Sequence, residues 1–154
     1  MDGRLNKIFS SPELSSEKMF LLIPQRPPMM MVDSFYGMEG DEAYCGLTVR
    51  DDCVFCIGGF LIEPGIIEHS AQSVAAMAGY RNFRDNLPPE IGYIGEIKSF
   101  SISRLPSVGE QLHTVVKEDA SVLGTTLASV TVFVEEEKIA EGKIKFSLQG
   151  GNGN

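Results

Sequence analysis

Hydrophobic and polar positions alternate along several short stretches of the chain. Residues 143–148 alternate most clearly, and residues 42–49 place four apolar side chains opposite polar or small ones. A two-residue period is typical of a strand with one buried face. Turn-forming residues separate these stretches, including a turn-rich segment at 37–41 and a charged run at 135–138. The pattern predicts six strands, at residues 29–35, 42–49, 91–103, 111–118, 125–134 and 143–148.

One stretch has the period of a helix instead. Residues 64–84 contain no proline after the first position, and their apolar residues recur at helical spacing on one face. Many of these residues are small, so the helix axis can lie close to whatever it packs on. A short leading helix is also predicted, because Ser11, Pro12 and Glu13 match an N-cap, a first helical position and a first-turn acid.

This order of elements restricts the architecture. Short connections favour antiparallel neighbours, and one helix cannot cover both faces of a six-stranded sheet. We therefore predict an α+β protein with the hot-dog fold, in which a curved antiparallel sheet wraps one long central helix. We therefore expect a partner subunit to bind the uncovered edge or face of the sheet. The predicted organisation is an N-terminal extension with a short helix (1–22), a single hot-dog domain (23–149) and a flexible tail (150–154).

Composition narrows the range of partners. The 154 residues include 13 Lys and Arg against 21 Asp and Glu, a formal net charge of -8. This charge opposes binding to nucleic acid or anionic lipid. Residues 19–23 form the longest apolar run near the N-terminus, far short of the roughly 20 residues that span a bilayer. We expect a cytoplasmic protein that neither binds nucleic acid nor inserts into a membrane.

Cysteines and glycines give little support for a cofactor. Cys53 and Cys56 form a C-x-x-C pair without a second pair or nearby histidines, so a zinc ion would have too few ligands. Gly58 and Gly59 are not followed by the Lys and Ser/Thr of a phosphate-binding loop. We expect neither a metal nor a cofactor.

The start of the long helix is the best candidate for chemistry. Gly65 has no side chain to block its own amide or that of Ile66, and free amides at a helix start can polarise a thioester carbonyl. Glu68 lies in the same turn, and Gln72 follows at i+4, where it can hold the carboxyl group. The alternative is that Glu68 only complements the helix dipole.

Other candidates are weaker. His69 is adjacent to Glu68 but about 100° around the helix, so it is either a catalytic group or a residue of the dimer interface. Met30 lies in a run of three methionines, which either fills the core or lines a tunnel for a flexible acyl chain.

Three motifs in order resemble the beta-hydroxyacyl-acyl carrier protein dehydratase family. Residues 24–28, followed by apolar residues and Val32-Asp33, match Pro-His-Arg-x-Pro…Val-Asp. Residues 64–72 match the helix motif Pro-Gly…Glu-x-x-Ala-Gln, and residues 104–112 match a third motif less closely. The resemblance implies dehydration of a 3-hydroxyacyl chain on acyl carrier protein by a homodimer or dimer-based oligomer. It also implies that Glu68 protonates the leaving hydroxyl and that the Gly65 amide binds the thioester oxygen.

The chain departs from this family at one position. The catalytic His of the family's Gly-His-Phe loop, which takes the α-proton, falls on Gly59, between Gly58 and Phe60. Cys56 and His69 are the nearby alternatives. We therefore consider three functions: a dehydratase-like enzyme of fatty-acid or related lipid or polyene synthesis, a hot-dog thioesterase acting on acyl-CoA or on acyl groups of acyl carrier protein, and a non-catalytic acyl-binding protein.

Two groups of residues are expected to bind ligands. The residues expected to bind substrate are Ile66, Gly59, Phe60 and Met30. Those expected to dock an acidic carrier are Arg81, Arg84, Arg104 and Lys98.

Overall fold

The structure, a computed structural model, describes residues 2–88, 90 and 92–148. Three helical segments and nine strands are described, in the following order: α1 (Gly3–Ile8), β1 (Leu14–Ser15), the 3₁₀ helix η1 (Ser16–Leu21), β2 (Ser34–Glu39), β3 (Glu42–Thr48), β4 (Cys56–Ile57), β5 (Phe60–Leu61), α2 (Glu63–Arg84), β6 (Gly92–Ile102), β7 (Gln111–Val122), β8 (Thr125–Val134) and β9 (Glu137–Leu148). The predicted tail, 150–154, lies outside the described residues.

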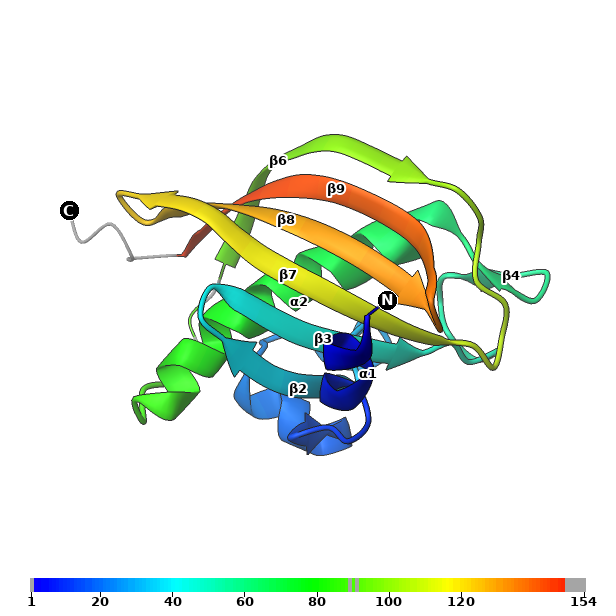
Figure 1. The fold of residues 1–154 in the computed structure, drawn as a ribbon, viewed down its shortest axis with the longest axis horizontal. Coiled ribbons are helices and arrows are strands. Elements are labelled where there is room, and N and C mark those ends of the chain that lie inside the picture. Colours follow the sequence, from blue (N-terminus) through cyan, green and yellow to red (C-terminus); the bar gives the residue numbers. More distant parts are fainter. Residues whose placement is uncertain (1, 89, 91, 149–154) are drawn as a thin grey trace.

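Seven strands form one antiparallel sheet in the order β1-β2-β3-β7-β8-β9-β6. Figure 1 shows this sheet curving along the long helix α2, which lies against one of its faces. Every pairing is antiparallel, and β7, β8 and β9 follow one another through tight turns. The predicted α+β hot-dog architecture is confirmed. No helix among the described residues has the length and apolarity needed to cross a membrane.

The main core lies between α2 and the sheet. Val130 and Val132 of β8 point into it, and from α2 Ile66, Val74 and Met77 are almost fully buried. A close contact is made at Gly79, where an added Cβ would overlap the main-chain carbonyl of Leu22. The segment before β2 therefore lies directly on the helix, as the small residues of α2 predicted.

The second face of the sheet is covered in part by α1 (Figure 1). Leu5 and Phe9 pack with Tyr44 of β3 into a separate buried cluster. The five central residues of β3 are consequently all buried. The prediction that this strand is half-buried is wrong, because the polar residues before Ser11 form a helix that covers its outer face.

The N-terminal extension contains the short helices α1 and η1, but the predicted helix start at Ser11 is wrong. Glu13 N donates to Phe35 O at 2.8 Å, and Ser16 N donates to Asp33 O at 2.9 Å. These bonds make β1 an edge strand beside β2, and helical structure resumes only as the 3₁₀ turn η1. Pairing with a distant strand outweighed the local capping pattern of Ser11.

The first predicted strand begins later than expected. Residues 29–31 are not a strand, because side chains of α2 bind their main-chain groups, and β2 starts only at Ser34. The hairpin with β3 is confirmed, although its turn is shorter, at Gly40 and Asp41. Strand β7 continues four residues further than predicted, to Val122, past a bulge, and β9 begins six residues earlier, at Glu137.

Candidate active site

The start of α2 differs from the prediction in one respect. The helix begins at Glu63, so Ile62 is the N-cap. Gly65 N donates to Ile62 O at 2.9 Å, and Ile66 N donates to the same oxygen at 3.2 Å. The prediction that these two amides are free is wrong, because the helix starts one residue earlier than expected and uses both.

Glycine at position 65 has a packing role in this structure. An added Cβ would lie 2.5 Å from Leu61 Cδ1 and 2.7 Å from Phe55 Cβ. Gly65 therefore lets the β4–β5 hairpin lie against the first turn of α2. Ile66, expected to bind substrate, is fully buried in the main core.

Glu68 and Gln72 form the expected i,i+4 pair. Gln72 Nε2 donates to Glu68 Oε2 at 2.8 Å. The glutamine is almost fully buried and also binds the preceding segment: Nε2 donates to Met29 O at 2.8 Å, and Oε1 accepts from Met31 N at 2.6 Å. Its orientation is therefore fixed by three partners. Glu68 is half-buried, so a carboxyl group held in one orientation stays accessible to a ligand.

His69, the next residue on α2, is fully buried and binds the same segment as Gln72. Its Nδ1 is 2.7 Å from Met31 O and its Nε2 is 2.7 Å from Thr114 Oγ1. A carbonyl oxygen can only accept, so Nδ1 carries the proton and Nε2 accepts from the threonine hydroxyl. Burial lowers the pKa of His69 to about 4. The imidazole is thus neutral, fully buried and used at both nitrogens, which suits a positioning residue.

Thr114 was not singled out from the sequence. Its position on β7 is separated from His69 by 45 residues. The available signal was the alternation of β7, which places Thr114 on the same face as Leu112 and Val116, toward α2. A polar residue at such a position requires a buried hydrogen-bond partner.

Gly58 and Gly59 form the turn of the β4–β5 hairpin. Their φ angles are +61° and +87°, a backbone conformation that favours glycine. Gly59 O accepts from Val108 N at 2.9 Å, and the Phe60 side chain remains exposed. The position aligned with the family's histidine is therefore a glycine turn in this chain.

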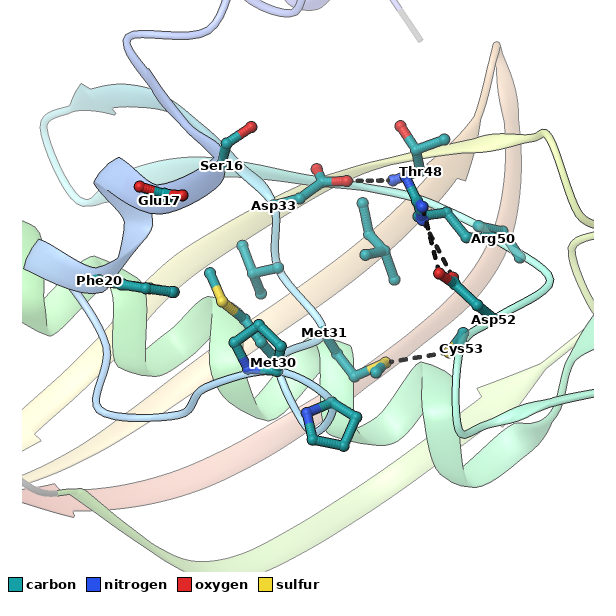
Figure 2. A pocket seen from close by; sticks show the side chains of 15 residues that line it. Ser16, Glu17, Phe20, Met30, Met31, Asp33, Thr48, Arg50, Asp52 and Cys53 are labelled. Carbon is teal, nitrogen blue, oxygen red and sulfur yellow. Dashed lines mark hydrogen bonds and ion pairs between the residues drawn. The ribbon is translucent and has the colours of Figure 1, made fainter.

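A cavity of about 460 Å³ lies where the segment before β2 diverges from the end of β3. Figure 2 shows Phe20 and the Arg50–Asp52 pair at opposite ends of it, with Met30 and Met31 along one side. Among the predicted site residues in the described part of the chain, Met30 alone lines this cavity. The full lining is Ser16, Glu17, Phe20, Pro27, Pro28, Met30, Met31, Val32, Asp33, Leu47, Thr48, Val49, Arg50, Asp52 and Cys53.

The cysteine pair shows no metal-binding geometry. Cys53 Sγ donates to Met31 Sδ at 3.7 Å. Burial is the main cause that raises the pKa of Cys56 to about 11, and the neighbouring Cys53 thiol raises it further. The Cys56 thiol therefore stays protonated at neutral pH. Among the described residues, no three His, Cys, Asp or Glu side chains are grouped to hold a metal ion.

The four basic residues expected to dock a carrier are mostly neutralised. Arg81 pairs with Glu118 at 2.6 Å, Arg104 contacts both Glu110 at 2.9 Å and Glu137 at 3.0 Å, and Lys98 lies 3.8 Å from Glu96. The Arg104 guanidinium lowers the pKa of Glu110 to about 2. Arg84 stacks over the Tyr80 ring at 5.4 Å. Three of the four positive charges are therefore shared with carboxylates of this chain.

Comparison with known proteins supports the dehydratase resemblance. The chain is 27% identical over 132 residues to a protein named 3-hydroxyacyl-[acyl-carrier-protein] dehydratase FabZ from Deinococcus radiodurans, covering 84% of this chain and 90% of that one. The fold of the present chain is similar to that of a chain in the dehydratase heterocomplex ApeI:P from Xenorhabdus doucetiae. The TM-score is 0.79, with 14% identity over 84% of this chain and 90% of that one. A hypothetical thioesterase with coenzyme A from Streptococcus pneumoniae shares the fold more loosely, with a TM-score of 0.58 and 9% identity over 75% and 84% of the two chains.

A family model also matches most of the chain. It is described as ApeP-like, ApeP dehydratase, and it matches residues 18–148, from η1 to the end of β9. This range contains the Glu68–Gln72 pair and the segment that Gln72 binds. The chain therefore belongs to the ApeP-like dehydratase family.

Proposed function

We propose that the protein takes part in the dehydration of 3-hydroxyacyl thioesters carried on acyl carrier protein, with Glu68 as the general acid. The observation that carries the proposal is the half-buried carboxyl group of Glu68, held by Gln72 on the central helix of a dehydratase-family chain. A base removes the α-proton, the carbon–carbon double bond forms, and the carbon–oxygen bond breaks. The hydroxyl leaves as water with the proton of Glu68.

The base in this scheme comes from a subunit with a different sequence, because a copy of this chain carries the same residues. Gly59 supplies no proton acceptor, and the two nitrogens of His69 are used inside the core. The fold similarity to a dehydratase heterocomplex favours an assembly of two chains that complete one site.

The edge strand β6 supports such an assembly. It ends the sheet order, and Tyr93, Ile94 and Ile97 on it are 54%, 39% and 41% exposed. An exposed apolar edge strand is a template for pairing with another chain. We infer that a second hot-dog subunit pairs along β6: a copy of this chain forms a homodimer there, and a related chain that carries the base forms the heterodimer that dehydrates.

Light scattering on the purified protein tests the homodimer. Ile97→Lys on β6 should shift the protein toward the monomer, whereas Val122→Lys, at the exposed end of β7, should not. A wild-type protein that is monomeric at every concentration contradicts the homodimer and leaves a heterodimer with a related chain as the form to assay.

Enzyme assays test the chemistry. The protein is incubated with 3-hydroxyacyl and plain acyl pantetheine thioesters, and enoyl formation and free thiol are followed in parallel. Glu68→Gln should lower dehydration about 10²-fold or more, as expected for loss of a general acid. Glu63→Gln, which changes an exposed acid in the first turn of α2, is the matched control. Equal turnover by Glu68→Gln and wild type would exclude the assignment.

Thioester hydrolysis is the second candidate. The glycine turn at Gly59 favours it, because hydrolysis by one helix carboxylate needs no loop histidine. Thiol release without enoyl formation would support a thioesterase. If neither product forms in the dimer or with a partner chain, the remaining function is that of a non-catalytic acyl-binding protein.

We propose a cytoplasmic location for the protein. All three cysteines are free thiols, which a reducing cytoplasm permits.

A further inference from the structure

Cys53 and Cys56 lie at the two ends of one tight turn. Cys56 N donates to Cys53 O at 3.0 Å, so Val54 and Phe55 are the central residues of a four-residue β-turn. Such a turn brings the Cα atoms of its first and last residues within about 7 Å, and disulfides join Cα atoms about 4.4–6.8 Å apart. The backbone therefore holds the two cysteines at a separation that a disulfide bond spans.

The two thiols also contact each other and are accessible. The Cys53 side chain is a hydrogen-bond partner of the Cys56 thiol, and both residues are half-buried free thiols. Cys53 also lines the cavity beside the end of β3, where Figure 2 shows it next to the sulfur of Met31. The exposed residues Glu17 and Asp52 border the same cavity. A small oxidant that enters the cavity can therefore reach Cys53.

The turn packs against the start of α2. Phe55 O accepts from Ile62 N at 3.0 Å, and Phe55 Cβ lies 2.7 Å from the position of an added Cβ at Gly65. A modification of this turn would therefore lie beside the first turn of the helix that carries Glu68.

The third cysteine lies apart from this pair. Cys45 on β3 is fully buried in the main core, and its Sγ donates to Ser73 O at 3.8 Å. Burial raises the pKa of Cys45 to about 12, so its thiol stays protonated near neutral pH. Because the thiolate is the form of cysteine that reacts, Cys45 is an internal control for the pair.

We propose that Cys53 and Cys56 are a peroxide-sensitive dithiol, which hydrogen peroxide converts to an intrachain disulfide that thiols reduce again. The Cys53 thiolate attacks the O–O bond and becomes a sulfenic acid, and the hydroxide that leaves takes up a proton to form water. The Cys56 sulfur then attacks the Cys53 sulfur, the S–O bond breaks, and the hydroxyl leaves as a second water with the proton of the Cys56 thiol. The two thiols thus lose two electrons and two protons, which reduce one peroxide to two water molecules.

The order of attack follows from the surroundings of the two sulfurs. Phe55 N donates to Cys53 Sγ at 3.4 Å, so a main-chain dipole points at the attacking atom. Burial, the neighbouring Cys53 thiol and the carboxylates of Asp51 and Asp52 raise the pKa of Cys56 to about 11. Cys56 is therefore a weak nucleophile toward peroxide in solution, but its position beside a Cys53 sulfenic acid favours the second step.

Mass spectrometry of the purified wild-type protein tests the proposal, whatever reaction the protein catalyses. After treatment with hydrogen peroxide and alkylation under denaturing conditions, the chain should have lost two hydrogen atoms and should carry an alkyl group only on Cys45. Peptide mapping should place the disulfide between Cys53 and Cys56, and dithiothreitol should restore all three thiols. Separate oxidation of the two cysteines, a disulfide between chains, or a protein that stays reduced overturns the proposal.

Two variants test the order of attack with dimedone, which traps sulfenic acids. Cys56→Ser should be labelled at Cys53 about tenfold faster or more than Cys53→Ser is labelled at Cys56, because only a thiolate attacks peroxide. Both variants keep Cys45, which should stay unlabelled in the folded protein and so controls for unfolding. Equal labelling rates in the two variants refute the assignment of the first attack to Cys53.

Discussion

Acidification should weaken this fold through His69. The imidazole is fully buried between Met31 O and Thr114 Oγ1, and its pKa is lowered to about 4. In the unfolded chain the pKa of histidine is about 6.5. The unfolded state therefore binds more protons between pH 6.5 and 4, and stability is lost as the pH falls through this window. At pH 4.5 the loss amounts to about 2–3 kcal/mol relative to pH 7.5, since each unit of pKa corresponds to about 1.4 kcal/mol.

Urea unfolding at pH 7.5 and pH 4.5 measures this difference. His69→Gln should be less stable than wild type at pH 7.5 but should lose about 2–3 kcal/mol less on acidification, because the carboxylates that also titrate are the same in both proteins. His113→Gln is the matched control at the second histidine, where burial also lowers the pKa. The reasoning is refuted if His69→Gln loses as much stability between the two pH values as wild type does.

Three further changes test other contacts. Gln72→Leu should lower the free energy of unfolding by about 2–4 kcal/mol and reduce turnover, because it leaves buried main-chain groups unpaired; urea unfolding and the enoyl assay measure the two effects. Gly79→Ala should be destabilising by about 2 kcal/mol in thermal melts despite alanine's higher helix propensity, since its methyl group would overlap the Leu22 carbonyl; a more stable variant would contradict this packing. Phe9→Ala should lower stability by about 3 kcal/mol and speed amide exchange in α1, because it removes the ring stacked on His113 at 4.5 Å; unchanged exchange would contradict the contact.

The elements predicted best are those whose signal is local. Strand β8 has the predicted bounds, 125–134, and α2 begins within one residue of the prediction. Both sequences repeat a clear period over ten or more residues and end at turn or proline signals. The Glu68–Gln72 bond was predictable for the same reason, because i,i+4 neighbours meet on any helix.

The errors occur where distant contacts decide local structure. Residues 29–31 have strand composition, yet Gln72 and His69 bind their main chain, so the strand cannot begin there. Likewise, Ser11 has the pattern of an N-cap, but pairing with β2 uses the backbone that would have become helical. Hydrogen-bond partners that lie far apart along the chain leave no periodic signal in one sequence. The cavity could not be predicted either, because it forms where η1, the segment before β2 and the end of β3 meet.

Position 59 shows why the chemistry of this chain points to a second subunit. A histidine there would have to adopt a φ of +87°, which is strained for a residue with a Cβ, although the space around it is open. The hairpin is thus built for glycine, and a local change of residue would not recreate the missing base at low cost. The acid that we propose, Glu68, is nevertheless oriented by Gln72 and only half-buried, and the exposed edge of β6 is available for pairing. These observations support our proposal that this chain supplies the acid half of a site that a related, base-bearing subunit completes.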